Sequence, residues 1–147
     1  EGFCSGSGLA QLARARLLEE RQAGRLLDDP RWAPSEEITP EKLAAAAREG
    51  DGFARSVYRI SAGYLGKGLA VIIDMLNPEM IIIGSIFERC EDLFREEMCR
   101  EIEQEALKSS YGVCQVAAAS LGDRIGDYAA LAVAFGYDGL CGGRREA

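Results

Sequence analysis

The most constraining feature of the sequence is a long amphipathic helix that meets a short apolar strand with almost no loop between them. Residues 64–78 read YLGKGLAVIIDMLNP, and residues 79–87 read EMIIIGSIF. Pro78 ends the helix, because the residue before a proline avoids the α conformation. The apolar residues Met80–Ile83 are too few for a helix and too apolar for a surface strand. They predict a central parallel strand that is buried on both faces.

The turn after this strand is a candidate ligand site. Gly84 and Ser85 follow the strand directly, so they lie at its carboxyl end. Nucleotides and sugars bind at such places in open α/β sheets. Gly84 has no side chain that would block a close approach of the backbone to a ligand. An ordinary strand-to-helix turn explains the same two residues equally well.

The residues before the strand predict three helices. The first occupies the opening residues, the second follows the capping residue Thr39 and stops at Gly50, and the third starts at Asp51. In the proline-rich loop after the first helix, Trp32 is expected to act as a packing anchor. The third helix carries an apolar stripe made of Phe53, Val57, Ile60, Tyr64, Gly68, Ile72 and Leu76. Three glycines weaken this helix by about 1 kcal/mol each, so we expect another helix or backbone close to Gly63, Gly66 and Gly68.

The residues after the strand predict a helix, a second strand and a last helix. The first of these helices should cover one sheet face with the apolar positions Cys90, Phe94, Met98, Ile102 and Ala106. Residues 113–119 predict the strand, Gly122 and Asp123 a structural turn, and residues 125–135 an apolar helix of the kind that is normally buried. The unit is therefore β-α-β-α with parallel strands. Two strands cannot make a self-sufficient sheet, so we expect neighbours from another chain or from a larger protein.

Composition excludes several classes of function. The chain has 147 residues, of which 48% are hydrophobic, and a net charge of −7. An acidic surface repels phosphate backbones, so we expect no nucleic-acid partner for this segment. Histidine is absent, which removes the commonest general base and zinc ligand. The five cysteines form no CxxC pair and no apolar run approaches about 20 residues, so we expect a cytoplasmic protein without a membrane partner.

Four phrases of the sequence resemble the ROK family of bacterial sugar kinases and repressors. They are EGFCSGSGL at residues 1–9, the pair Gly50-Asp51, YLGKGLAVIIDMLNPEMIIIG at residues 64–84, and SLGDRIGDYAAL at residues 120–131. The third is the most specific, because it is similar to the family's LGxGLANLINLLNPExIVIGG in sequence and in the order of elements.

The resemblance implies an α/β fold, a partial ribonuclease-H-like (actin-like ATPase) lobe that is predominantly helical with a short parallel β-α-β-α unit. It further implies two segments. Residues 1–50 would be a helical segment that follows the family's zinc motif. Residues 51–147 would be the long helix and the β-α-β-α C-terminal part of the second kinase lobe.

The resemblance also implies ATP-dependent phosphorylation of a hexose, of the glucose or N-acetylhexosamine type. Glu1 matches the family glutamate that hydrogen-bonds sugar hydroxyls, and Gly84 with Ser85 matches the position beside the nucleotide. The family's catalytic aspartate, phosphate loops and zinc cysteines lie upstream of these phrases. We therefore expect no catalytic residue and no metal ligand in this chain. ATP and Mg²⁺ would serve the parent protein, with Zn²⁺ upstream of this segment.

Two alternatives to a kinase stay open. Ser85 and Ile86 stand where the family usually continues with glycines, and a β-branched residue such as Ile86 resists positive φ. This departure is compatible with the sugar-sensing domain of a ROK repressor. A structural segment that mediates dimerisation through the glycine-bearing helix is the other alternative. We expect a homo-oligomer, and no kinase activity from these 147 residues alone.

Overall fold

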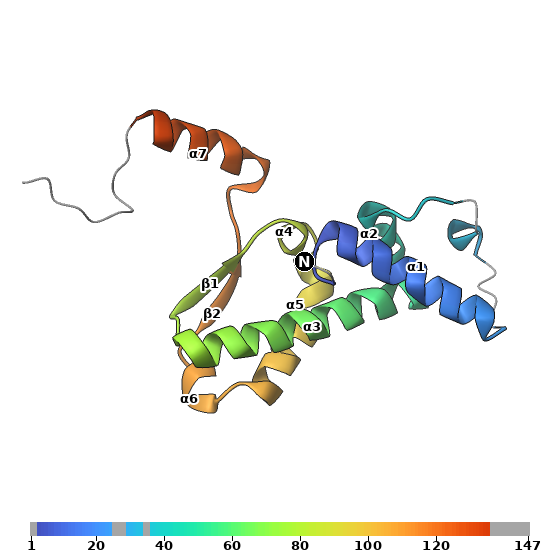
Figure 1. Cartoon of the computed structure of the whole chain (residues 1–147), viewed down its shortest axis with the longest axis horizontal. Coiled ribbons are helices and arrows are strands. Elements are labelled where there is room, and N and C mark those ends of the chain that lie inside the picture. Colours follow the sequence, from blue (N-terminus) through green and yellow to red (C-terminus); the bar gives the residue numbers. More distant parts are fainter. Residues whose placement is uncertain (1–2, 25–28, 34–35, 136–147) are drawn as a thin grey trace, which may run out of the picture.

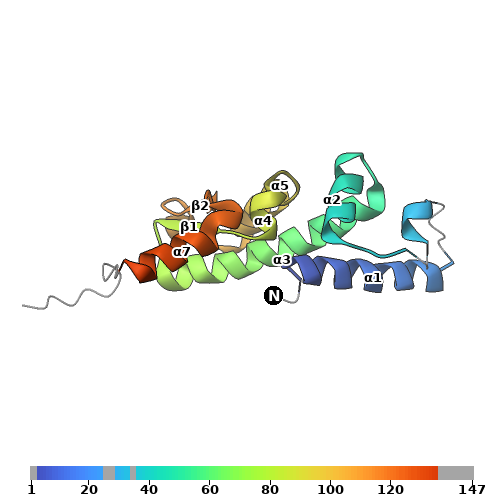
Figure 2. The same ribbon diagram turned by 90° about the horizontal axis from the view of Figure 1, so that it is seen from above.

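The computed structural model describes residues 3–24, 29–33 and 36–135. The elements in chain order are α1 (Gly6–Gln22), η1 (Pro30–Trp32), α2 (Pro40–Arg48), α3 (Gly52–Leu76), β1 (Met80–Ile83), α4 (Ile86–Arg89), α5 (Glu91–Glu105), α6 (Lys108–Tyr111), β2 (Gln115–Ala118), η2 (Gly122–Arg124) and α7 (Ile125–Ala134). The long helix α3 runs from α1 and α2 to the strands (Figure 1). In the second view, α1 and α7 lie at opposite ends of the molecule (Figure 2).

The contact between α3 and α5 forms the centre of the core. The five apolar positions predicted for the α5 region are all buried, which confirms that part of the pattern. A Cβ atom on Gly66 would lie 2.7 Å from the carbonyl oxygen of Met98 and 2.7 Å from the Cβ atom of Glu101. The close approach that we expected at the glycines is therefore confirmed at Gly66. At Gly63 a Cβ atom would make ordinary contact, and at Gly68 it would meet nothing within 4 Å.

The apolar stripe predicted for α3 is wrong in its second half. Tyr64, Ile72 and Leu76 are exposed, whereas the buried apolar residues of the helix are Ala54, Val57, Tyr58, Ala62, Gly66, Leu69, Ala70 and Ile73. The physical reason is that α3 carries apolar residues on two faces. The partner helix packs on the face that contains Gly66, because only there can the two backbones approach closely.

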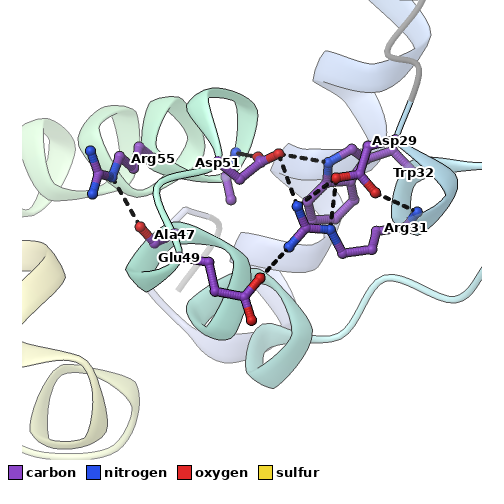
Figure 3. A network of polar contacts seen from close by, with 8 residues as sticks. Asp29, Arg31, Trp32, Ala47, Glu49, Asp51 and Arg55 are labelled. Atoms are coloured by element: carbon purple, nitrogen blue, oxygen red, sulfur yellow. Dashed lines mark hydrogen bonds and ion pairs between the residues drawn. The ribbon is translucent and has the colours of Figure 1, made fainter.

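A polar network fixes the loop before α2 to the start of α3 (Figure 3). Trp32 is buried, and its indole N–H donates to the carboxylate of Asp51 at 3.3 Å. Asp51 also caps α3, and Arg31 forms ion pairs with Glu49 at 2.7 Å and with Asp51 at 3.6 Å. The prediction that Trp32 anchors this loop is confirmed. The division of the chain at residue 50 stays a prediction.

The strands β1 and β2 form a two-stranded parallel sheet in which Met80 lies opposite Gln115 and Ile83 lies opposite Ala118. Ile81 and Ile83 pack against the core. On the other face Met80 is exposed, and Ile82 is 65% exposed. The prediction that this strand is buried on both faces is therefore wrong for this chain.

The last helix is also more exposed than we predicted. No residue of α7 is buried, although residues 125–135 are almost wholly apolar. The helix stands apart from the helical body, beyond the two strands (Figure 1). Both corrections have the same cause, because no element in the described part of the chain covers the outer face of the sheet or encloses α7.

The backbone turns sharply after β1. Ser85 has φ 60° and ψ −129°, and the only other described non-glycine residue with a positive φ is Asn77, which ends α3. The positive φ falls on Ser85 and not on the β-branched Ile86, which begins α4. A residue with a Cβ atom in such a conformation costs about 1–3 kcal/mol. The turn after β1, which belongs to the candidate ligand site, is therefore strained at Ser85.

Replacement of Gly66 by alanine should destabilise the chain, because the added Cβ atom would overlap the backbone of α5. We expect Gly66→Ala to lower the free energy of unfolding by about 2 kcal/mol, measured by urea denaturation. Gly68→Ala is the matched control on the same helix. It should raise stability by up to about 1 kcal/mol, because alanine favours the helix and nothing is displaced. Equal stabilities of the two variants would contradict this packing.

Replacement of Ser85 by glycine should stabilise the chain, because glycine adopts positive φ without steric cost. The side chain of Ser85 makes no capping hydrogen bond, so little is lost. We expect Ser85→Gly to raise the free energy of unfolding by about 1 kcal/mol. Ser120→Gly, in the exposed turn after β2, is the control and should lower stability by a few tenths of a kcal/mol. A destabilised Ser85→Gly variant would show that this conformation is not strained.

Candidate functional site

A pocket opens at the carboxyl ends of the two strands. Its volume is about 300 Å³, and it is lined by the turn after β1, α4, the turn after β2 and the start of α7: Gly84, Ser85, Glu88, Arg89, Ala119, Gly122 and Ile125. Parallel strands bring their carboxyl ends to the same edge of a sheet, which is where open α/β sheets hold their ligands. The structure thus places Gly84 and Ser85, the two predicted nucleotide-binding residues, in one pocket.

Small residues form the wall between the two strand ends. The backbone N–H of Ala119 donates to the carbonyl oxygen of Ile83 at 2.8 Å, which extends the strand pairing by one residue. A Cβ atom on Gly84 would lie 3.7 Å from the Cβ atom of Ala119. Gly122 has φ 56°, a conformation that favours glycine. The backbone of both turns therefore borders the pocket.

Glu88 brings a charge into this pocket. Its Oε1 atom lies 3.2 Å from the point that a Cβ atom on Gly122 would occupy. The carboxylate of α4 therefore packs against the bare backbone of the turn after β2. The sequence analysis did not single out Glu88, and it interpreted Gly122 only as a structural turn. The position of Gly122 just after the second strand was the available signal, by the same reasoning that selected Gly84.

Phe3 and Cys4 contact α3 and do not line this pocket. Glu1, the predicted sugar-binding residue, is outside the described residues. The hydroxyl of Ser61 donates to the carbonyl oxygen of Phe3, and the Phe3 ring stacks on Tyr64 with centroids 4.8 Å apart. Burial raises the pKa of the Cys4 thiol, so this cysteine is less readily ionised than an exposed one.

A second concave surface lies between α2, α3 and α5. Its volume is about 610 Å³, and charges of both signs line it, including Arg48, Arg55, Arg59, Asp92 and Glu96. Arg48 forms a two-bonded ion pair with Asp92, with both N–O distances 2.8 Å. The hydrogen bonds from Arg48 lower the pKa of Asp92. This ion pair connects α2 to α5, so we interpret the surface as part of the helix packing.

Neither a metal-binding cluster nor a membrane-spanning helix occurs in the described ranges. No group of three or more histidine, cysteine, aspartate or glutamate residues there is arranged to hold a metal ion. None of the helices in those ranges combines the length and apolar character needed to cross a bilayer. The candidate site is the pocket at the strand ends.

The sequence is similar to repressors and to a kinase. It is 28% identical over 124 residues to the Xylose repressor of Caldicellulosiruptor bescii, which covers 84% of this chain and 30% of the relative. It is 29% identical over 126 residues to the Glucokinase of Halalkalibacterium halodurans, which covers 86% of this chain and 37% of the relative. It is also 27% identical over 107 residues to the DNA-binding transcriptional repressor Mlc of Escherichia coli, covering 73% of this chain and 24% of the relative.

Solved structures share the fold. A ROK family transcriptional regulator, a homolog of the Escherichia coli MLC protein, has a TM-score of 0.65 and 26% identity over 80% of this chain and 28% of its own. A ROK family glucokinase from Streptomyces griseus, solved with glucose and AMPPNP, has a TM-score of 0.59 and 24% identity over 84% of this chain and 40% of its own. The predicted partial ribonuclease-H-like lobe is confirmed.

The chain spans between 24% and 37% of the lengths of the three relatives named above. The ROK family pattern, by contrast, covers residues 1–135 of the 147. This match agrees with the two parallel strands and with the pocket at their carboxyl ends. The chain belongs to the ROK family.

Proposed function

We propose that this chain forms the nucleotide-facing part of the second lobe of a ROK sugar kinase. The observation that carries the proposal is the pocket that the turns after β1 and β2 share. Nucleotides bind at this edge of open α/β sheets. The relative named Glucokinase supports a kinase as the parent protein. The substrate would be ATP together with a hexose, of the glucose or N-acetylhexosamine type that we expected.

The residues of the pocket fit the nucleoside end of a nucleotide. Gly84 and Gly122 bring backbone without side chains into the pocket lining, which suits a flat or branched ligand group. The pocket lies near the lower end of the roughly 300–1,000 Å³ that small-molecule sites occupy. It would therefore hold part of a nucleotide, with the remainder directed away from the strands. ATP would supply the phosphoryl group, and the residues of this chain would bind and orient it. We assign no residue of this chain to Mg²⁺.

The sugar site would use a residue near the amino terminus. Glu1 matches the family glutamate that accepts hydrogen bonds from sugar hydroxyls, and a carboxylate can accept from two neighbouring hydroxyls at once. The contacts of Phe3 with Ser61 and Tyr64 attach Phe3 itself to α3. Glu1→Gln should weaken glucose binding by the parent kinase, and unchanged binding would remove Glu1 from the proposal.

The sugar-sensing domain of a ROK repressor is the second candidate. Two observations favour it. Ser85 occupies a glycine-type conformation at the nucleotide edge, and relatives of the chain include the Xylose repressor and the DNA-binding repressor Mlc. A repressor domain would bind sugar without needing ATP. Nucleotide binding therefore separates the two candidates.

The kinase proposal predicts saturable binding of AMPPNP to the 147-residue chain, measured by isothermal titration calorimetry. Gly84→Val should abolish the binding, because its side chain would project between the strand ends, while circular dichroism should show an unchanged helix content. Gly68→Ala is the control, since this position lies on α3 outside the pocket lining. Absence of binding to the unmodified chain would favour the repressor candidate. Equal binding by Gly84→Val would place the nucleotide elsewhere.

We also expect no phosphoryl transfer by these 147 residues alone. Transfer requires phosphate-binding loops, a metal-binding carboxylate and a base or positioning residue, and the resemblance places all of these upstream of this segment. The measurement is a coupled ADP-release assay with ATP, Mg²⁺ and a panel of hexoses. Turnover above a control without protein would contradict this expectation and would assign catalytic residues to this chain.

A further inference from the structure

The Glu88 side chain lies at the strand ends, in the lining of the pocket. Glu88 belongs to the short helix α4, whose neighbouring residues Ile86 and Phe87 are both buried. Its carboxylate faces the turn after β2, with Oε1 3.2 Å from the point that a Cβ atom on Gly122 would occupy. Gly122 therefore leaves the space that this carboxylate uses. The helix α4 and the turn after β2, far apart in the sequence, thus meet at this acidic group.

The carboxylate has unused capacity for hydrogen bonds. In residues 3–24, 29–33 and 36–135, none donates a hydrogen bond to Glu88 or forms an ion pair with it. Glu88 is half-buried in the pocket lining. An ionised carboxylate accepts up to about four hydrogen bonds and donates none. A ligand that supplies hydroxyl donors at this position would gain charge-assisted hydrogen bonds.

The charge of Glu88 also selects which end of a nucleotide lies beside it. A phosphate group in contact with the Glu88 carboxylate would be repelled by it, because like charges repel, whereas a phosphate group near Arg89 in the same lining would be attracted. The sugar of a nucleoside is uncharged and carries two neighbouring hydroxyls. Acidic residues bind such ribose hydroxyls in other open α/β sheets. The position of Glu88 therefore favours ribose over phosphate.

We propose that Glu88 binds the ribose 2′- and 3′-hydroxyls of the nucleotide and so fixes the direction in which the nucleotide lies across the strand ends. The phosphates would then point away from α4. This inference rests on the proposed nucleotide site and adds a specificity-determining residue to it. It also adds to the reason for Gly122, because a Cβ atom at that position would crowd the carboxylate as well as disfavour the positive φ.

The test compares two ligands and two proteins. The affinities of the 147-residue chain and of Glu88→Gln are measured by calorimetry for ATP and for 2′,3′-dideoxy-ATP, which lacks both hydroxyls. Glutamine keeps the shape of the side chain but removes its charge. We expect the unmodified chain to prefer ATP by about tenfold or more, as for hydrogen bonds to a charged group. The preference should fall to about threefold or less in Glu88→Gln, because hydrogen bonds to a neutral group are weaker.

The matched control is a second glutamate-to-glutamine substitution, at a residue that does not line the pocket. Glu96→Gln, on the exposed side of α5 and outside the pocket lining, should keep the full preference for ATP. Equal affinity of the unmodified chain for the two ligands would overturn the assignment of Glu88 and leave the nucleotide site standing. Tighter binding of both ligands to Glu88→Gln would also overturn it, because it would place a phosphate beside the carboxylate. No binding of either ligand would overturn the proposed function itself.

Discussion

The close contact between α3 and α5 at Gly66 is the constraint on which the rest of the structure depends. The carbonyl oxygen of Met98 and the side chain of Glu101 occupy the space that a Cβ atom on Gly66 would need. This contact fixes the distance between α3 and α5. β1 follows α3 directly, and β2 follows α5 through α6. The helix pair therefore sets where the strands meet, and the strands set where the pocket opens.

The structure leaves apolar surface uncovered on the side away from this contact. Val71, Ile72 and Met75 of α3 are exposed, as are Met80 and Ile82 of β1. Contiguous apolar surface of this kind usually marks a contact with other protein, and a parallel sheet is normally covered on both faces. The relatives named above extend well beyond the length that this chain matches. The homo-oligomer that we expect, and the cover that a larger lobe would provide, both stay predictions.

The buried residues of a helix could be predicted from the sequence where the helix has a single apolar face. The spacing of four from Cys90 to Ala106 has only one apolar face, so the buried side of α5 followed directly. It failed on α3, because two apolar faces overlap there and periodicity alone does not say which one meets the partner. The burial of β1 and α7 was overestimated for a related reason. Their composition reflects neighbours that the described part of this chain does not contain.

The candidate site was predicted only in part for a similar reason. Gly84 and Ser85 could be selected because they follow a strand directly. Glu88 could not, because its role depends on a contact with Gly122, which lies 34 positions further along the sequence. The positive φ at Ser85 also needed the structure, since serine rarely adopts it and no local motif requires it.

The most direct test of a site shared by the two strand ends is hydrogen–deuterium exchange of the 147-residue chain with and without AMPPNP. We expect slower exchange in two separate segments, residues 84–89 and 119–125, because both contribute to the lining of one pocket. We expect no change along the charged surface between α2 and α5. Protection confined to that surface, or to only one of the two segments, would contradict a ligand site shared by the two strand ends.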